Sequence, residues 1–369
     1  MKRLLLLGGG HAHVRVLADL ARRPLPRWEV LLLTPDAQQV YSGMLPGWIA
    51  GHYTLDQCSI DLQSLARVAC ARLVLDAAAG LDLAGRVVQT RLHETIDFDV
   101  LSIDVGSAPP TNLVDGAASH AVAVRPVPGF AAAWEGLVRR VHGSCRPFSV
   151  TVLGAGAGGV ELALALRHRS LREGWSHVIV HLVGADAVPL PGAPSAARQA
   201  VMRLLRQRCI QWHGESRATA VHADHVDLAG GKSVPADACW IVTGAAAPNW
   251  LAESALATDD EGFVRVTPTL QSASHPQVFA AGDAASLQEG LPKSGVYAVR
   301  SGAVLARNLH SYCTGESLRS WRPQSRALYL LSTGDHRALA IWGNIVWQGT
   351  WAWYWKDWID RRFIRKYSA

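Results

Sequence analysis

Two glycine-rich turns, each directly after an apolar run, constrain this 369-residue chain more than any other feature. The first turn, Gly8–His13, follows Leu4–Leu7, and the second, Gly154–Gly159, follows Val150–Leu153. A buried strand, a glycine turn and a helix start together form a cradle for a diphosphate. Because glycine has no side chain, the phosphate groups can approach the backbone closely there, and the helix N-terminus stabilises their negative charge. Two such cradles predict two dinucleotides in one chain, and electron transfer between them.

The segments around the two turns predict an α/β fold with two Rossmann-like units. Each unit reads as strand, helix and strand, which implies parallel sheets with right-handed crossovers. The first unit is expected at residues 3–7, 12–22 and 29–33, and the second at 148–153, 158–168 and 177–183. Further strands are expected at 99–104, 239–244 and 278–283, and further helices at 126–141, 197–209 and 296–309. The segment Tyr41–Gly47 is rich in turn residues and is expected to be an ordered loop.

The order of these units predicts one dinucleotide-binding domain interrupted by another. The first domain is expected at residues 1–112 and 253–318, around a second at 113–252. Residues 319–369 differ in composition, because they hold 7 of the 14 tryptophans, and we expect a separate C-terminal region there.

Composition favours a globular protein without a special polyanionic partner. The chain is 49% hydrophobic and 18% charged, with a net charge of +6. No nucleic-acid motif appears, so no nucleic-acid partner is expected. The opening apolar run is interrupted by glycine after Leu7, too early for a signal peptide, and no apolar stretch is long enough to cross a membrane. We therefore expect a cytoplasmic protein.

The cysteine and histidine spacing predicts no metal and no redox disulfide. The six cysteines are scattered with no C-x-x-C pair, so we expect buried, reduced thiols. His11 and His13 form an H-x-H pair with no third ligand nearby in the sequence. A packing role or a place beside a cofactor is expected for both.

The two glycine turns are unequal. His13 stands where the third glycine of the first motif belongs, so its helix must stand off the strand or the imidazole must fill a gap. An acid that binds a ribose should follow about 20 residues later. The first unit offers Asp36 after Thr34, whereas the second has Gly184 and no obvious substitute. The choice between NADH and NADPH therefore stays open.

Together these residues resemble the two-dinucleotide-binding flavoproteins of the pyridine nucleotide-disulfide oxidoreductase superfamily. Within it, the chain resembles the type II NADH dehydrogenase group, and most of all the oxidoreductase module associated with selenide water dikinase. The motifs that carry the resemblance are Gly8–Val14, Tyr41–Gly47 (YSGMLPG), Asp104–Pro109, Gly154–Glu161, Ala281–Asp283 and Lys293–Val296. The YSGMLPG string is the one specific to the narrow group.

The resemblance implies FAD in the first unit and NAD(P)H in the second. The implied FAD residues are Gly8, Gly10, His11, Ala12, Thr34, Pro46, Gly106, Gly282, Asp283, Gly295 and Val296. The implied NAD(P)H residues are Gly154, Gly156, Gly159 and Gly244, and the implied catalytic residues are Glu161 and Lys293. Asp283 would bind the ribityl chain of the flavin, although an aspartate there also suits a helix N-cap. The chain departs from the superfamily by lacking a redox disulfide, and from sulfide:quinone oxidoreductases by its cysteine positions.

The C-terminal segment predicts an amphipathic helix. Its aromatic and apolar residues recur at helical spacing: Trp351, Tyr354, Trp355, Trp358, Ile359 and Phe363. Lys356, Asp357, Asp360, Arg361, Arg365 and Lys366 are expected mostly on the other side. From Trp351 to Ala369, five Lys or Arg and two Asp leave a net charge of +3. Such a helix is expected to lie in a membrane interface, on the inner face of the membrane. The alternative is that it packs on the protein itself or on a partner subunit.

Three functions are consistent with these features. The first is an FAD-dependent oxidoreductase that passes electrons from NAD(P)H through flavin to a quinone-like acceptor. The second is an FAD enzyme acting on a selenium, sulfur or small organic substrate without NAD(P)H, as the missing ribose acid suggests. The third is a non-catalytic flavin-binding interaction module. A homodimer is compatible with all three.

Overall fold

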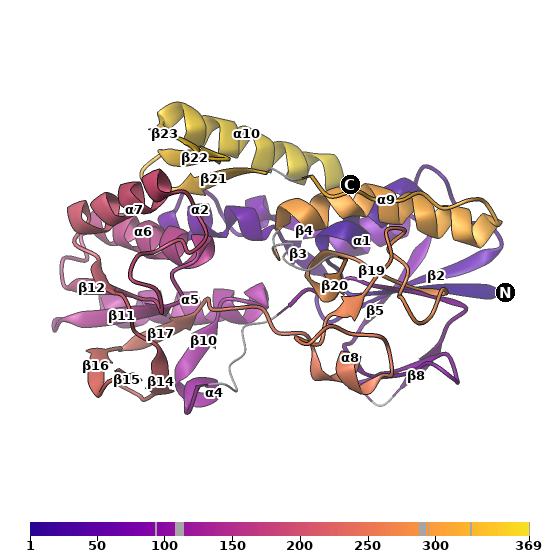
Figure 1. Ribbon diagram of the computed structural model, residues 1–369, viewed down its shortest axis with the longest axis horizontal. Helices are drawn as coiled ribbons and strands as arrows, with labels where there is room; N and C mark the ends of the chain where they lie inside the picture. The colour runs from indigo at the N-terminus through magenta and orange to yellow at the C-terminus, as the bar shows by residue number, and fades with distance from the viewer. Residues whose placement is uncertain (93, 108–113, 288–292, 294, 325–326, 369) are drawn as a thin grey trace.

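Two parallel five-stranded sheets form the two lobes of the molecule (Figure 1). The computed structural model describes residues 1–92, 94–107, 114–287, 293, 295–324 and 327–368. The first sheet has the strand order β19-β9-β1-β2-β5, and all its pairs are parallel. Its strands are β1 (Lys2–Leu7), β2 (Trp28–Thr34), β5 (Ala71–Leu75), β9 (Val100–Ile103) and β19 (Val278–Ala280).

The second sheet has the order β10-β17-β11-β12-β13 and is also parallel. Its strands are β10 (Ala121–Ala123), β11 (Phe148–Leu153), β12 (Val178–Val183), β13 (Gln211–His213) and β17 (Ala238–Ile241). Leu4–Leu7 and Phe148–Leu153 are buried throughout, as expected for parallel strands covered on both faces. The predicted fold class, an α/β protein with two Rossmann-like units, is confirmed.

Helices cover the sheets, and small antiparallel sheets extend each lobe. The helices are α1 (His11–Leu20), α3 (Leu62–Val68), α4 (Ala117–His120), α5 (Val127–His142), α6 (Ala157–Arg172), α7 (Ser195–Gln207), α8 (Asn249–Glu253) and α9 (Gly295–Thr314). The added strands are β3 (Gln38–Val40), β4 (Ser59–Asp61), β6 (Ala78–Asp82), β7 (Val87–Thr90), β8 (Thr95–Asp97), β14 (Ala218–Val221), β15 (His225–Leu228), β16 (Lys232–Pro235), β18 (Val264–Arg265) and β20 (Ala285–Ser286).

His13 fills the space that the missing glycine left open. Its imidazole is fully buried between α1 and the sheet. Nδ1 donates to the Gly8 carbonyl at 2.6 Å, so Nε2 accepts from the Ser102 hydroxyl at 2.8 Å. Burial lowers the pKa of His13 to about 4, which keeps the ring neutral. The imidazole thus ties the glycine turn to β9, which a glycine at this position would not do.

The YSGMLPG segment is helical, which corrects the expected loop. Ser42–Met44 form a 3₁₀ turn that continues into α2 (Leu45–Ala50). Pro46 stands in the first turn of α2, and Gly51 ends it in the left-handed conformation at φ 80°. Proline fits a helix start because it needs no N–H partner there, and glycine fits the end. Gly43, Pro46 and Gly47 are typical turn residues. The 3₁₀ turn and the six-residue helix α2 are too short to show a helical period that would outweigh that signal.

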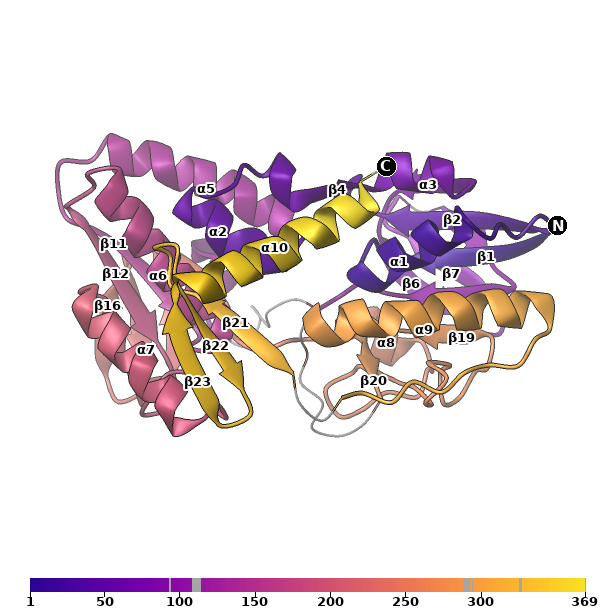
Figure 2. The ribbon, with the colours of Figure 1, turned by 90° about the horizontal axis from the view of Figure 1, so that it is seen from above.

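The C-terminal region crosses both lobes (Figures 1 and 2). It consists of an antiparallel sheet of β21 (Leu328–Ser332), β22 (Ala338–Trp342) and β23 (Ile345–Gly349), followed by α10 (Thr350–Tyr367). Helix α10 contacts β21–β23 over the second lobe, and also α1 and β4 of the first lobe. Among the described residues, no helix is both long and apolar enough to cross a membrane.

The faces of α10 differ from the sequence expectation. Trp351, Tyr354, Trp355 and Trp358 are exposed, as an interfacial helix requires. Asp360, however, is buried and Lys356 is largely buried against the protein, so this pair does not belong to a solvated polar face. Phe363 also turns inward and stacks on Tyr41, with ring centroids 4.4 Å apart.

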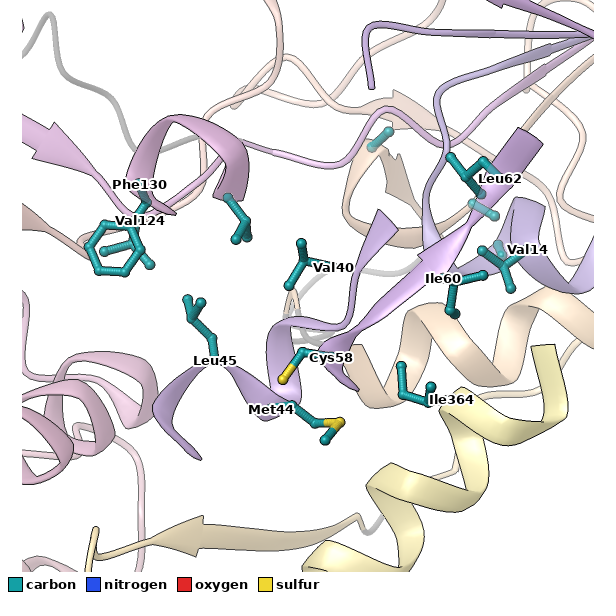
Figure 3. Close-up of a cluster of buried hydrophobic side chains, with 14 of the residues drawn as sticks. Val14, Val40, Met44, Leu45, Cys58, Ile60, Leu62, Val124, Phe130 and Ile364 are labelled. Atoms are coloured by element: carbon teal, nitrogen blue, oxygen red, sulfur yellow. The ribbon is translucent and has the colours of Figure 1, made fainter. Parts of the chain in front are cut away.

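The hydrophobic core runs continuously from the first lobe into the second (Figure 3). Met44 of the 3₁₀ turn and Leu45 of α2 lie between Ile60 of β4 on one side and Phe130 of α5 on the other (Figure 3). Ile364 brings α10 into the same cluster. The YSGMLPG segment is therefore a packed connection between the lobes.

Three of the six cysteines contradict the expectation of buried thiols. Cys58 and Cys239 are buried and Cys313 is partly buried, but Cys70, Cys145 and Cys209 are exposed. All six are unpaired. Burial raises the pKa of Cys58 to about 12, so the thiol next to the YSGMLPG segment is not a reactive thiolate.

Replacing His13 with leucine tests its structural role. His13→Leu removes two buried hydrogen bonds and leaves the Ser102 hydroxyl without its partner, which costs about 1–3 kcal/mol. We expect the thermal unfolding midpoint to fall by several degrees, measured by circular dichroism. The exposed His120→Leu variant is the control and should unfold like the parent. An unchanged midpoint for His13→Leu would show that the imidazole is only a space filler.

Candidate functional site

The first glycine turn is built as a close-packed cradle at the carboxyl end of β1. Gly8 has φ 93° and donates its N–H to the Leu33 carbonyl at 2.8 Å. A Cβ at Gly10 would collide with the side chain of Asp104, and one at Gly9 would collide with Leu62. Gly106 has φ 71° and faces open space. These glycines are required by backbone conformation and by close approach, as a diphosphate cradle demands.

An unexpected carboxylate occupies the N-terminus of α1. Asp104, directly after β9, is buried, and its Oδ2 accepts the N–H groups of Ala12 at 2.8 Å and His13 at 2.9 Å. These N–H groups carry the partial positive charge of the helix end. Asp104 belongs to the motif Asp104–Pro109, but no role was predicted for it from the sequence. The signal was an acid at the carboxyl end of a central strand, where ligands of open α/β sheets bind.

The surroundings of Asp104 favour its protonated form. Burial raises the pKa of Asp104 to about 7, the hydrogen bonds from His13 and Ala12 oppose that shift, and the charge of Asp283 adds to it. Within the described residues, no lysine or arginine forms an ion pair with Asp104. Gly282, with φ 64°, lies against the other carboxylate oxygen. The carboxyl group of Asp104 therefore already occupies the helix N-terminus where a bound anion would sit, and its surroundings favour the neutral form.

Asp283, the predicted ribityl ligand, is engaged by side chains from elsewhere in the chain. Arg125 donates to its Oδ2 at 2.8 Å and Ser107 at 3.2 Å. The carboxylate does not cap the short 3₁₀ helix Gly282–Ala284, so the N-cap alternative is not what the structure contains. Arg125 follows β10 of the second sheet, so this ion pair joins the two lobes beside the first cradle.

The other residues assigned to the first cradle surround it on several elements. Thr34 is buried beside Gly9 at the end of β2, and Asp36 follows, half-buried. Burial raises the pKa of Asp36. His11 packs its ring against Tyr41 and Phe363, at 5.3 and 5.8 Å between centroids, and burial lowers its pKa to about 4.

The remaining assigned positions lie on α2 and α9. Pro46 is buried in α2. Gly295 and Val296 begin α9, where a Cβ on Gly295 would stand 4.0 Å from the Ser42 hydroxyl. The YSGMLPG segment and the start of α9 are thus neighbours.

The structure places Lys293 away from the Glu161 cluster described below. The Lys293 Nζ donates to the Ala285 carbonyl at 2.6 Å and lies 3.8 Å from the centre of the Phe263 ring. Burial lowers its pKa. The two predicted catalytic residues therefore do not contact each other.

The second glycine turn forms an unobstructed cradle at the start of α6. Gly154 has φ 112°, and a Cβ at Gly159 would collide with the Gly154 carbonyl. Gly156 faces open space and precedes α6 without a side-chain cap. Within the described residues, the N–H groups of Ala157, Gly158 and Gly159 donate to no protein atom. In contrast to α1, this helix end is free to receive an anion.

An indole occupies the position expected for a ribose-binding acid. A Cβ on Gly184, directly after β12, would stand 2.6 Å from the Trp212 ring, and one on Gly214 would stand 2.8 Å from it. The Trp212 Nε1 donates to the Ala187 carbonyl at 3.4 Å. Leu190 of the following loop donates its N–H to the Ala155 carbonyl at 2.8 Å. This edge of the second cradle is apolar and packed.

Gly244, the fourth residue assigned to the second cradle, is exposed after β17 with φ 57°.

A buried charged cluster joins the second cradle, the YSGMLPG segment and α10. Glu161, one turn into α6, accepts the Ser332 N–H at 2.7 Å. The Lys356 Nζ, on α10, donates to the Gly43 carbonyl and to Asp360 Oδ2, both at 2.6 Å. Tyr41 lies next to the same pair, where burial first, and then the charge of Asp360, raise its pKa.

The electrostatics of this cluster combine a fixed cation with a proton-exchanging acid. Burial raises the pKa of Glu161 to about 7, and the charge of Lys356 opposes that shift. Burial acts to lower the pKa of Lys356, but the charges of Asp360 and Glu161 outweigh it and raise it. A carboxylic acid whose pKa lies near neutral pH, within the field of a permanent ammonium group, is suited to general acid catalysis.

Sequence reasoning identified Glu161 in this cluster but missed Lys356, Asp360 and Tyr41. Lys356 and Asp360 were assigned to a solvated face because charges are usually exposed. Their i,i+4 spacing was the available signal, since it allows one ion pair to satisfy both groups on the same side of a helix.

Comparison with solved structures shows the same fold in several oxidoreductases. The chain superposes with the sulfide:quinone oxidoreductase of the hyperthermophilic bacterium Aquifex aeolicus at a TM-score of 0.83 and 18% identity, covering 100% of this chain and 91% of that one. NDH2 from Plasmodium falciparum, solved with NADH, gives a TM-score of 0.81 at 11% identity, with 99% and 98% covered. The water-forming NADH oxidase of Lactobacillus brevis, also bound to NADH, gives 0.74 at 18% identity, with 92% and 75% covered.

The family follows from the sequence match. Residues 2–302, which include both cradles, Asp283 and the start of α9, match the pyridine nucleotide-disulphide oxidoreductase family. The chain therefore belongs to the pyridine nucleotide-disulphide oxidoreductases, a family of flavin-dependent enzymes.

Proposed function

We propose that this protein is an FAD-dependent oxidoreductase that takes electrons from NAD(P)H and passes them to a quinone-like acceptor. The observation that carries the proposal is the largely buried Lys356–Asp360 ion pair of α10, whose Lys356 charge acts on the Glu161 carboxyl group of α6. One chain thus combines two dinucleotide cradles with a proton source, which two-electron transfer to a quinone requires.

The first cradle fits FAD. Gly8, Gly10 and Gly106 provide the bare backbone that a diphosphate needs, and Asp36 stands at the end of β2 where a ribose acid is expected. When bound, FAD supplies the two-electron carrier between donor and acceptor. Asp283 would have to exchange Arg125 for the ribityl hydroxyls, or bind them while it keeps the ion pair.

The second cradle fits the diphosphate of a nicotinamide nucleotide. Its N–H groups at the start of α6 have no partner among the described residues, and Gly156 faces open space. Because Gly184 and the Trp212 indole stand at the position of the ribose acid, the chain lacks the carboxylate that would there select the 2′-hydroxyl of NADH against the 2′-phosphate of NADPH. Both nucleotides are therefore expected to serve as donors, and the nicotinamide would point towards Glu161.

The acceptor site is proposed beneath α10. Reduction of a quinone to a quinol consumes two electrons and two protons. A hydride equivalent brings both electrons and one proton, so the site needs a source for one further proton. Glu161, with a pKa of about 7, can supply one proton, and the Lys356 ammonium stabilises negative charge that develops on the acceptor. His11, Tyr41 and Phe363 provide the aromatic surface that a flat ring would contact.

The outer surface of α10 is proposed to lie on a membrane, from which a lipid-soluble acceptor would enter. Trp351, Tyr354, Trp355 and Trp358 are 42–62% exposed. Arg362 lies 5.1 Å from the centre of the Trp358 ring, and Arg365 and Lys366 are exposed near the C-terminus. Exposed tryptophans beside basic residues are typical of interfacial helices. Trp342, Ile345 and Trp347 add exposed apolar area on the adjoining β-sheet.

One observation favours the second candidate function, an FAD enzyme that oxidises a sulfur, selenium or small organic compound. The packed Trp212 and the Leu190–Ala155 hydrogen bond make the ribose edge of the second cradle less accessible than a standard site. A donor other than a nucleotide would then reduce the flavin, and the acceptor side would be unchanged.

The two half-reactions can be measured separately. Anaerobic mixing of the flavin-loaded protein with NADH or NADPH should bleach the flavin band, and a water-soluble quinone should then restore it. In Lys356→Met the reoxidation should be slower by about tenfold or more, because the cation beside the acceptor is lost. The bleaching rate should change much less. Lys366→Met, an exposed residue of the same helix, is the matched control.

A bound flavin that neither nucleotide reduces would contradict NAD(P)H as the donor and favour the second candidate. Equal reoxidation rates in Lys356→Met and the parent would contradict the acceptor site beneath α10. A protein that FAD does not reconstitute would contradict both flavin functions.

Flavin affinity should depend on pH through Asp104. The folded pKa of about 7 lies above the ordinary value, so stability from this group is full at low pH and is lost as pH rises through about 7. A diphosphate next to Asp104 favours its protonated form still further. FAD binding should therefore take up a proton and weaken above pH 7.

In Asp104→Asn, which keeps an acceptor for the Ala12 and His13 N–H groups, FAD should bind about tenfold more tightly than in the parent at pH 8, and the pH dependence should flatten. Titration calorimetry of FAD into apoprotein, in two buffers of different ionisation enthalpy, measures both affinity and protons. An identical proton uptake in the variant would assign it to another group.

The membrane proposal predicts binding to vesicles that contain anionic lipid. Replacing Trp351, Trp355 and Trp358 together with glutamine should weaken vesicle co-sedimentation by at least about tenfold, because three interfacial side chains are lost. Leu75→Gln, which changes an equally exposed apolar residue on β5, is the control. Unchanged binding of the triple variant would contradict this orientation. Truncation before α10 is not equivalent, because it would also remove Lys356 and Asp360 from the interior.

A further inference from the structure

A cluster of imidazoles and a carboxylate lies on the small antiparallel sheet of the second lobe, outside the two cradles. We propose that His222, His225 and Asp227 form a binding site for a divalent transition-metal ion of the Zn²⁺ class. His222 lies in the turn after β14, and the other two residues lie on β15. In Figure 1 this sheet projects from the side of the lobe opposite α10. The site is therefore separate from the proposed electron-transfer path.

The ligand atoms are already near coordination distance from one another. His222 Nε2 lies 3.0 Å from Asp227 Oδ2, and His225 Nε2 lies 3.6 Å from Asp227 Oδ1. The two imidazole rings stack with centroids 4.4 Å apart. All three ligand atoms lie within 4.8 Å of one another. In tetrahedral Zn²⁺ sites with bonds of about 2.0–2.2 Å, neighbouring ligand atoms are separated by about 3.4 Å. Small side-chain rotations would place an ion among them.

A second carboxylate orients one of the ligands. Asp224 Oδ1 accepts from His225 Nδ1 at 2.6 Å. A histidine that donates Nδ1–H to a carboxylate keeps its Nε2 lone pair free and directed, which is the arrangement of metal-bound histidines. Here Nε2 lies 3.6 Å from Asp227 Oδ1, and an ion bound between these two atoms would be shared by both. This orientation distinguishes the cluster from histidines that meet on a surface by chance.

The backbone holds the ligands on a rigid support. Successive side chains of a strand alternate between faces, so His225 and Asp227 share the outer face of β15 while Val226 and Leu228 are buried beneath. His225 pairs with Pro235 and Asp227 with Ser233 of β16. The His222 N–H donates to the His225 carbonyl at 2.8 Å, which fixes the turn against the strand.

The donor set selects the class of ion. Two imidazole nitrogens and one carboxylate suit Zn²⁺, Co²⁺, Ni²⁺ or Cu²⁺, whereas Mg²⁺ and Ca²⁺ prefer oxygen ligands alone. The cluster is at the surface, so one or more water molecules would complete the coordination. A bound ion would crosslink the turn to β15 and stabilise the hairpin. The prediction of no metal rests on the cysteines, His11 and His13; the pattern H-x-x-H-x-D at 222–227 is the sequence signal for this second cluster.

Titration calorimetry with Zn²⁺ on the EDTA-treated and desalted full-length protein tests the site. We expect one site per chain, and binding at least about tenfold weaker in His222→Ala, His225→Ala and Asp227→Asn. Asp224→Asn should weaken binding by about tenfold through loss of orientation alone. His120→Ala, which changes an exposed histidine of α4, should bind like the parent. Zn²⁺ should also raise the thermal midpoint of the parent but not of His225→Ala, whose midpoint without metal shows that it folds.

Co²⁺ absorption identifies the ligands directly. A tetrahedral visible band without sulfur-to-cobalt charge transfer is expected for nitrogen and oxygen ligands. Charge-transfer bands near the ultraviolet would place the ion on an exposed cysteine, Cys70, Cys145 or Cys209, and overturn the proposal. Retained Zn²⁺ affinity in His222→Ala and His225→Ala, or no Zn²⁺ binding by the parent, would overturn it as well.

Discussion

The buried ammonium group of Lys356 is the interaction on which the arrangement of the candidate site depends. It donates to the Gly43 carbonyl in the YSGMLPG segment and to Asp360 on its own helix, and it lies in the field of Glu161. An ammonium ion removed from water is costly unless it is paired and hydrogen-bonded, so α10 can dock only with these partners in register. One side chain thereby ties the C-terminal helix to the YSGMLPG segment, the packed connection between the lobes.

The two cradles share a shape and differ in charge. In the part of the chain that the structure describes, the N–H groups at the start of α6 have no partner and offer a positive potential, whereas Asp104 partly neutralises the start of α1. In the proposed function, the second site is thus electrostatically ready for a nucleotide that binds and leaves, and the first carries a carboxyl group whose protonation is coupled to the resident cofactor. The glycine motifs alone do not predict this difference in charge, because a glycine determines only how closely another group can approach the backbone.

Sequence reasoning succeeded where a local pattern has one structural solution. Continuous apolar runs such as Leu4–Leu7, followed by glycine, predicted the central strands and both helix starts. It was wrong for Tyr41–Gly47, since Gly43, Pro46 and Gly47 suggest turns but here belong to short helical segments stabilised by packing against both lobes. It was also wrong for Cys70, Cys145 and Cys209, because a scattered cysteine gives no local signal of its exposure. The domain boundaries and the roles of the assigned site residues stay predictions.

By itself the sequence determined the two dinucleotide folds, the family resemblance and the aromatic character of the C-terminal helix, because each is carried by neighbouring residues or by a helical period. Only the tertiary structure decided which charges meet. Asp104 reaches the start of α1, Arg125 pairs with Asp283, and Lys356 turns inward beside Glu161. These contacts join residues far apart in the chain, and their energies depend on burial and on the partners that burial provides, neither of which a local pattern encodes.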